Sequence, residues 1–299
     1  MSPRRLPRFI LIAISLLPAT HATSRPVVAL LTDFGLENEA VGLCHGAILA
    51  VSSDIEVVDL CHAGTPFDVR LAGLMLRGTE VFPKGTVFVA VVDPGVGTER
   101  SGVAIKTGKG FFYVAPNNGL LSSVMEDQGV AAAYILEPTR VNPSWTPGTF
   151  DGRDLFSPAG ALLATGHGDL ERVGRPMPLE GIVRVEPLRA KVIPAEKKVI
   201  GHYVRTDLPY GNVWTDITRE NLQAIGAKSV KTLLVRMVDR EVPLPLVVSF
   251  GHVAKGQPLA YFASDGCLAL ALNQGNLKEA WGLEEGMDVE VRMGESEPR

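Results

Sequence analysis

Two segments of the sequence combine carboxylates with an arginine, residue types that can hold or deprotonate a water molecule. Residues 93–100 (DPGVGTER) follow an apolar run, and residues 149–156 (TFDGRDLF) precede an apolar helical stretch. Asp93 and Arg100 are close enough along the chain to form a purely structural ion pair. The residues alone leave both interpretations open.

Three further segments place polar side chains directly after apolar runs: residues 32–35 (TDFG), 116–121 (PNNGLL) and 207–212 (DLPYGN). Ligands of α/β sheets bind outside the carboxyl ends of the strands. A carboxylate at Asp33 could therefore accept hydrogen bonds from a ribose diol. A turn or a helix cap is the alternative for each segment.

The surrounding elements predict two domains. Residues 26–182 alternate between strand-like and helical stretches, which predicts an α/β domain with a largely parallel sheet. After a linker at 183–190, residues 191–294 contain short β-type runs, which predict a small all-β, barrel-like domain. In the first domain we expect strands at 27–32, 55–60, 86–93 and 110–115, and helices at 38–50, 66–82 and 153–167.

Composition narrows the classes of protein. The 299 residues are 46% hydrophobic and 21% charged, which is ordinary for a folded soluble chain and excludes disordered and collagen-like classes. The formal net charge of −4, without a cluster of Lys and Arg, argues against nucleic acid as a partner.

The N-terminus predicts export. Three arginines precede an apolar run from Phe9 to Leu17, and small residues follow at Thr20 and Ala22. This pattern is typical of a secretory signal peptide, here residues 1–22, and the run is short for a membrane-spanning helix. We expect a periplasmic or secreted protein with no membrane association after cleavage; an uncleaved anchor is the alternative.

The three cysteines, Cys44, Cys61 and Cys267, lack the spacing of a zinc site. In an oxidising compartment one disulfide could form and would leave one thiol over. Burial of all three as small hydrophobic residues is the alternative.

Taken together, the motifs resemble the S-adenosyl-L-methionine (SAM) hydroxide adenosyltransferases and the related SAM halogenases, over about residues 26–292. The resemblance implies SAM as substrate and no further cofactor. It also implies a homotrimer that binds SAM between the N-terminal domain of one subunit and the C-terminal domain of its neighbour. The motifs, in the family's order, are TDFG, DPGVGT followed by Arg100, PNNGLL, TF-x-GRD-x-F-x-P, D-x-P-Y-GN-x-x-T and NQGN at 273–276.

Within this family the resemblance favours hydrolysis to adenosine and methionine. Water-using members carry an Asp, Arg and His set, whereas halogenases have Tyr at the Asp position and Ser after the His position. Asp93 and Arg100 match the water-using pair, and Gly152 is not Ser. Asp151 stands where the family has His, and on electrostatic grounds we expect Asp151→His to raise hydrolysis by about tenfold.

The catalytic set implied is Asp93, Arg100 and Asp151, with Arg100 holding the water and Asp93 accepting its proton. Asp33 would bind the ribose hydroxyls, Phe67 would pack near the sugar, and Asp207, Asn212 and Ser264 would hold the methionine end. The substrate-binding residues implied are Asp33, Phe34, Phe67, Asn117, Phe150, Asp207, Tyr210, Asn212 and Ser264.

Three other functions stay open at this stage. Asp151 and the predicted export suggest a SAM- or adenosine-binding protein without efficient turnover. A SAM halogenase is disfavoured by Asp93 and Gly152. A metal site built from Asp93 and Asp151 is disfavoured because hard cations recruit more oxygen ligands, so no metal is expected.

Overall fold

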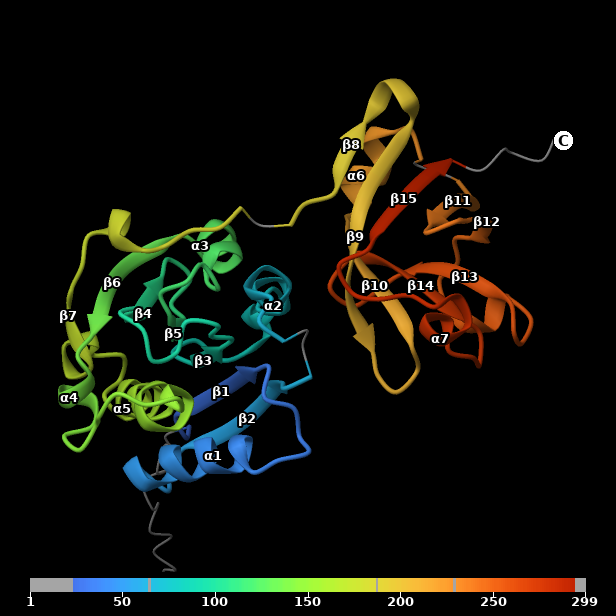
Figure 1. The fold of residues 1–299 in the computed structure, drawn as a ribbon. Helices are drawn as coiled ribbons and strands as arrows, with labels where there is room; N and C mark the ends of the chain where they lie inside the picture. Colours follow the sequence, from blue (N-terminus) through green and yellow to red (C-terminus); the bar gives the residue numbers. More distant parts are fainter. Residues whose placement is uncertain (1–23, 64–65, 187, 228–229, 294–299) are drawn as a thin grey trace, which may run out of the picture.

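The computed structural model describes residues 24–63, 66–186, 188–227 and 230–293, which form two domains (Figure 1). The first is an α/β domain around a seven-stranded sheet, and the second is all-β around an eight-stranded sheet. The predicted fold class is therefore confirmed for both domains.

The N-terminal sheet has the strand order β2-β1-β3-β5-β4-β6-β7. Its first four strands are parallel, so their carboxyl ends meet at one edge, where the segments after β1 and β3 leave the sheet. The remaining three strands pair in antiparallel fashion. The strands are β1 (Val27–Thr32), β2 (Glu56–Cys61), β3 (Val87–Val91), β4 (Gly102–Thr107), β5 (Phe112–Pro116), β6 (Val130–Leu136) and β7 (Gly174–Pro176).

Helices cover both faces of this sheet because alternate residues of its buried strands point to opposite sides. In β1, Val28 and Leu30 belong to one apolar core, and Ala29 and Leu31 to the other. Helices α1 (Ala40–Val51) and α5 (Ser157–Thr165) pack on the first side, and α2 (Val69–Met75) and α3 (Ser122–Gln128) on the second. The short helix α4 (Pro138–Val141) lies beside β7.

Two predicted helices differ from the observed ones in their boundaries. The helix expected at 66–82 begins only at Val69, because the Asp68 side chain accepts hydrogen bonds from the N–H groups of Arg70 and Leu71 and so caps it. The helix expected at 153–167 is preceded by a wider π-type turn, Gly152–Phe156. Turns of this type are frequent at functional sites. Strands β4 and β6 were not expected from the sequence.

The C-terminal sheet is antiparallel throughout, with the order β12-β11-β15-β9-β10-β14-β13 and β8 paired to β9. A bridge between Leu246, just after β12, and Ala260 of β13 brings the two edges together, so the sheet is a nearly closed barrel. Its elements are β8 (Lys191–Ile193), β9 (Lys198–Asp207), β10 (Asn212–Thr218), α6 (Arg219–Ala224), β11 (Thr232–Met237), β12 (Arg240–Pro245), β13 (Pro258–Phe262), β14 (Cys267–Leu272), α7 (Leu277–Trp281) and β15 (Asp288–Met293).

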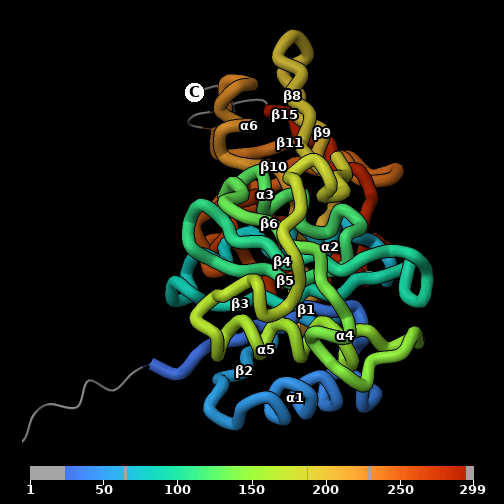
Figure 2. Tube along the Cα trace, turned by 90° about the vertical axis from the view of Figure 1, so that its left-hand side faces the viewer, coloured from blue at the N-terminus to red at the C-terminus, as the bar shows by residue number. Residues whose placement is uncertain are grey.

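The chain after β7 runs along the N-terminal domain to the barrel, as Figure 2 shows in yellow. A small apolar cluster of Leu71, Leu74, Leu188 and Val204 joins the domains. No helix in the described part of the chain is long and apolar enough to cross a membrane. The predicted signal peptide, residues 1–22, lies outside the described residues.

Candidate active site

A cavity of about 260 Å³ opens at the carboxyl edge of the N-terminal sheet. It is formed by the turn after β1, the segment around Phe67, the turn after β3 and the start of the π-type turn. It thereby brings together Asp33, Phe34, Phe67, Asp93, Phe150 and Asp151, all of which the sequence had placed in the site.

Arg100 joins the two carboxylates of this cavity. Its Nε lies 3.1 Å from Asp93 Oδ1, and its Nη2 donates both to Asp93 Oδ2 and to Asp151 Oδ2, the latter at 3.0 Å. The guanidinium also lies 5.2 Å from the centre of the Phe156 ring. None of the three charged side chains is more than 10% exposed, so this ionic cluster is largely shielded from solvent.

Arg100 faces the carboxylates and is not among the residues that line the cavity. Its Nε and Nη2 are occupied by Asp93 and Asp151, whereas Nη1 is buried and has no hydrogen-bond partner among the described residues. Of the five N–H donors of the guanidinium, those on Nη1 are the ones left for a further ligand. Asp93 and Asp151 are thus the groups that meet the contents of the cavity.

Trp145 completes the surroundings of Asp151 and was missed from the sequence. Its Nε1–H donates to Asp151 Oδ1 at 3.2 Å, so both oxygens of Asp151 accept an N–H donor. Trp145 comes from a loop of Pro, Gly, Ser and Thr six residues before Asp151, and no motif marks it.

Burial raises the pKa of the Asp93 carboxyl above its ordinary value. The Arg100 guanidinium and the N–H of Gly95 oppose this rise, and the nearby Asp151 adds to it. A carboxylate with a raised pKa is a stronger base than an ordinary aspartate. The site therefore holds a carboxylate suited to accept a proton.

Asp33 and Phe67 also line this cavity and contact each other. The N–H of Phe67 donates to Asp33 Oδ2 at 3.0 Å. The Phe67 ring is 70% exposed, and its backbone has φ 67°, a left-handed conformation that costs a non-glycine residue free energy. A strained, exposed aromatic residue at the mouth of a cavity suggests a role in binding.

Two rings crowd the position of Gly152. Phe34 and Phe150 meet edge to face at 5.8 Å. A Cβ atom on Gly152 would lie 2.9 Å from the Phe34 ring and 3.4 Å from the Phe150 ring. A side chain at position 152 therefore requires these rings to move.

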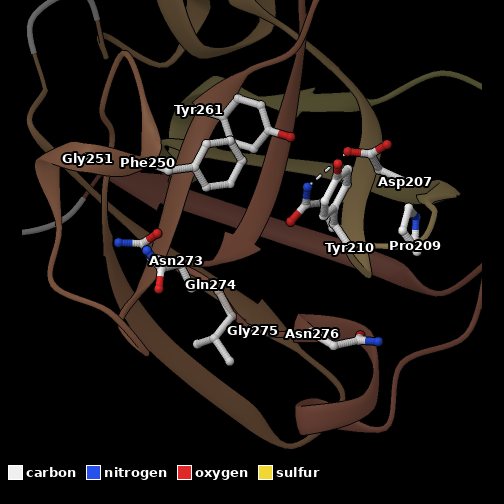
Figure 3. Close-up of a pocket in the computed structure, with 12 residues that line it drawn as sticks. Asp207, Pro209, Tyr210, Phe250, Gly251, Tyr261, Asn273, Gln274, Gly275 and Asn276 are labelled. Atoms are coloured by element: carbon white, nitrogen blue, oxygen red, sulfur yellow. Dashed lines mark hydrogen bonds between the residues drawn. The ribbon is translucent and has the colours of Figure 1, made fainter.

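A second cavity, of about 740 Å³, lies in the C-terminal domain (Figure 3). Asp207, Tyr210 and Asn212, which the resemblance had assigned to substrate binding, line it, and Asn212 Nδ2 donates to Asp207 Oδ2 at 2.9 Å. The sequence did not single out the facing rings of Phe250 and Tyr261, 5.1 Å apart. The NQGN motif had marked the stretch that supplies Asn273, Gln274 and Asn276.

Two expected substrate-binding residues lie elsewhere. Asn117 donates to the carbonyl of Gly181 and accepts from the N–H of Val183, so it ties the interdomain segment to the N-terminal domain and lines neither cavity. Ser264 lines a third cavity, of about 430 Å³, between the two domains.

The cysteines are all unpaired: Cys44 is buried, and Cys61 and Cys267 line the interdomain cavity. Within the described residues, no group of three or more His, Cys, Asp or Glu side chains could hold a metal ion.

Comparisons with known proteins agree with this architecture. Models of the SAM hydroxide adenosyltransferase N-terminal and C-terminal domains match residues 28–174 and 201–290. The (R)-S-adenosyl-L-methionine hydrolase of Thermus thermophilus is 38% identical, over 89% of this chain and 99% of the relative.

A fluorinase of Actinopolyspora mzabensis is 35% identical, over 90% of this chain and 97% of the relative. Among solved structures, an uncharacterised conserved protein from Thermotoga maritima superposes with a TM-score of 0.81 at 33% identity, over 89% of this chain and 99% of that one.

Proposed function

This chain belongs to the SAM hydroxide adenosyltransferase family, and on that premise we propose that it hydrolyses SAM to adenosine and L-methionine. The family contains both SAM hydrolases and fluorinases. The observation that carries the proposal is the Asp93–Arg100–Asp151 cluster, whose two carboxylates line the same cavity as Asp33.

The proposed reaction requires little beyond a positioned water. The sulfonium of SAM is a good leaving group, so attack on ribose C5′ requires a water held in line and a base for its proton. Asp93 lines the cavity and has a raised pKa, so we assign it as the base. Arg100 then orients Asp93 and balances its charge, and any direct contact with the water would come from Nη1.

Asp33 is the proposed ribose-binding group. A carboxylate has lone pairs for about four hydrogen bonds, so Asp33 can accept the N–H of Phe67 and two ribose hydroxyls together. Phe34, Phe67 and Phe150 would pack against the sugar and exclude water from the reacting carbon.

The cavity in the barrel fits the adenine better than the methionine end. Phe250 and Tyr261 offer flat faces to a purine, and Asn212, Asn273 and Asn276 offer both donors and acceptors. Among the described residues, Asp207 is the only charged one that lines it, so within this part of the chain a methionine carboxylate would find no cation there. The interdomain cavity, in contrast, combines Ser264 with charges of both signs, namely Arg77, Arg205, Asp216 and Asp265.

A SAM halogenase is the second candidate, because several relatives are named fluorinase. Gly152 weighs against it, because glycine has no side chain to bind a halide and any side chain there would require the Phe34 and Phe150 rings to move.

The deciding experiment is to incubate the purified protein with SAM in ¹⁸O-labelled water, with and without fluoride or chloride, and to identify the nucleoside. Adenosine with one solvent oxygen at C5′ supports hydrolysis, whereas a 5′-halo nucleoside establishes halogenation. Tight SAM binding without any product would point to a binding protein.

We also propose a homotrimer in which a neighbour's barrel completes each site, since the two cavities share no lining residue. Co-expression of Asp93→Asn and Asn212→Ala chains tests this arrangement. Each variant alone is impaired, but mixed oligomers contain some sites with both halves intact. Activity that recovers on mixing supports sites between subunits, and its absence would place both halves within one subunit.

Export is proposed from residues 1–22 alone. We expect the mature chain to begin near Thr23 in the periplasm or medium, which intact-mass measurement of exported protein would show. Retention of residues 1–22 in a membrane fraction would contradict it.

A further inference from the structure

His62 is a buried, titratable residue outside the proposed reaction, and it reaches the candidate site through hydrogen bonds. Its side chain is only 2% exposed. Its Nδ1 lies 2.8 Å from Thr32 Oγ1, and its carbonyl accepts the N–H of Gly35 at 2.7 Å. His62 is therefore bonded to both ends of the turn, residues 32–35, that carries Asp33.

An irregularity at the end of β2 brings the two side chains together. Leu30 of β1 pairs with Asp59, but Leu31 pairs with Cys61, so Leu60 is an extra residue in β2. Such a bulge re-aims the side chains that follow it. Without it Thr32 would lie opposite Cys61, whereas the bulge places it beside His62.

One arrangement of protons satisfies the contacts of Thr32. The Thr32 hydroxyl donates to His62 Nδ1 and accepts the N–H of Phe34, whose nitrogen is 3.2 Å away. The proton of the neutral imidazole then lies on Nε2, which is 3.0 Å from Asp59 Oδ1 but is not in hydrogen-bond geometry with it. The nearby Asp59 carboxylate favours this tautomer electrostatically, and the tautomer leaves Nδ1 free to accept.

Asp59 is itself shared with a second histidine. His45 of α1 places its Nε2 2.7 Å from the same Asp59 oxygen. Burial alone would raise the pKa of Asp59, but the contacts with His45 and His62 outweigh it and hold that pKa below its ordinary value. The group beside His62 Nε2 is therefore a charged carboxylate.

We propose that His62 is a positioning residue for Asp33: through its contacts with Thr32 and Gly35 it fixes the turn that aims the Asp33 carboxylate at the ribose hydroxyls. The ribose as ligand rests on the proposed function. The role of His62 in fixing the turn, including the hydrogen bond from Phe67 N–H to Asp33, does not rest on the proposed function.

Paired substitutions distinguish the contact at Nδ1 of the imidazole from the contact at Nε2. Thr32→Val removes the hydroxyl and keeps the shape, whereas Thr32→Ser keeps the hydroxyl. His62→Asn retains an acceptor near the Nδ1 position, whereas His62→Gln retains a donor near the Nε2 position and loses the contact with Thr32. His202→Gln is the matched control, because His202 forms a comparable pair with Asp216 in the other domain.

The first readout is the dissociation constant of the full-length protein for adenosine and for 2′,3′-dideoxyadenosine. We expect Thr32→Val and His62→Gln to raise the dissociation constant for adenosine by about tenfold and that for the dideoxy analogue by less than about twofold. Thr32→Ser, His62→Asn and His202→Gln should stay within about threefold of the unmodified protein for both ligands. If His62 has only a structural role, both dissociation constants should rise equally, and this result would overturn the proposal.

The second readout does not need a ligand. Hydrogen exchange of the Phe34 and Phe67 amides should be faster in Thr32→Val and His62→Gln at unchanged melting temperature, because both amides bond to the turn. If the unmodified protein binds no adenosine, the proposed function fails, but the exchange rates of these two amides still test the role of His62. Unchanged exchange in both variants would overturn it.

Discussion

The two main cavities differ in the chemistry of their walls. The N-terminal cavity is small and is bounded by three carboxylates, two of which are held by Arg100 and largely removed from solvent. The C-terminal cavity is larger and is lined by aromatic rings and amides, with Asp207 as its one charged residue. Buried, paired charges suit the stabilisation of a reacting group, whereas rings and amides suit recognition of a planar base. Substitutions in the first should therefore change turnover, and those in the second affinity.

The largest effect should follow from Asp93→Asn, which keeps the shape of the side chain and removes the base. We expect kcat to fall by roughly 10³-fold and the dissociation constant for SAM to change by less than about threefold. Single-turnover kinetics and calorimetry measure the two quantities. Glu99→Gln, an exposed acid in the same loop, is the control. A variant that turns over normally would remove Asp93 from the mechanism.

Asn212→Ala tests the other half of the comparison. Loss of the amide removes its own contacts and deprives Asp207 of a donor, so the dissociation constants for SAM and adenosine should rise by about 10- to 100-fold. We expect kcat to stay within about threefold. Gln223→Ala, exposed on α6, is the control. If methionine binding weakens and adenosine binding does not, the barrel cavity holds the methionine end instead.

The two-domain architecture could be predicted from the sequence because it follows from local patterns. Apolar strand-like runs alternate with amphipathic helical stretches in the first domain, and short β-type runs fill the second. Asp33, Asp93 and Asp151 were found because they follow strands or fall within dense motifs. Their convergence in one cavity depends on strand order, which a single sequence does not encode locally.

What the sequence missed depends on long-range contacts. Trp145 has an ordinary loop sequence around it, and only the fold brings its N–H to Asp151. Asn117 belongs to a family motif, yet the fold uses it to bind the interdomain segment. Strands β4 and β6 were also missed; β6 contains three alanines in a row, and Ala has a low propensity for strands.

A smaller effect is expected on the pH dependence of kcat/KM when Asp151 loses its charge, because Asp151 acts on the pKa of Asp93. The proposed hydrolysis requires Asp93 to be deprotonated, so kcat/KM should fall as the pH drops through its raised pKa. The charge of Asp151 contributes to that rise, so in Asp151→Asn the acid limb of the profile should move to lower pH, by less than about one unit. Asp154→Asn, whose carboxylate pairs with Arg153 outside the cavity, should leave the limb in place. A large loss of turnover at every pH would mean that Asp151 itself is the base.

The smallest net effect is expected for Asp151→His, for which the sequence alone predicted a rise of about tenfold. Removing a negative charge near the nucleophile still favours hydroxide, by about 1 to 2 kcal/mol. However, a neutral imidazole has one acceptor nitrogen, whereas Asp151 accepts from both Trp145 and Arg100. One buried donor is then left unpaired, at a cost of about 1 to 3 kcal/mol.

These opposing terms should leave kcat at neutral pH within about threefold of the unmodified protein. Adding Trp145→Phe removes the unpaired donor, so the double variant should show the rise that the single variant lacks. The test compares kcat of Asp151→His, Trp145→Phe and the double variant at neutral pH, after melting temperatures have confirmed folding. If Asp151→His alone is already tenfold faster, loss of the Trp145 hydrogen bond does not lower kcat. If the double variant is slower than either single one, Asp151 and Trp145 act together as an adapted pair that a histidine cannot replace.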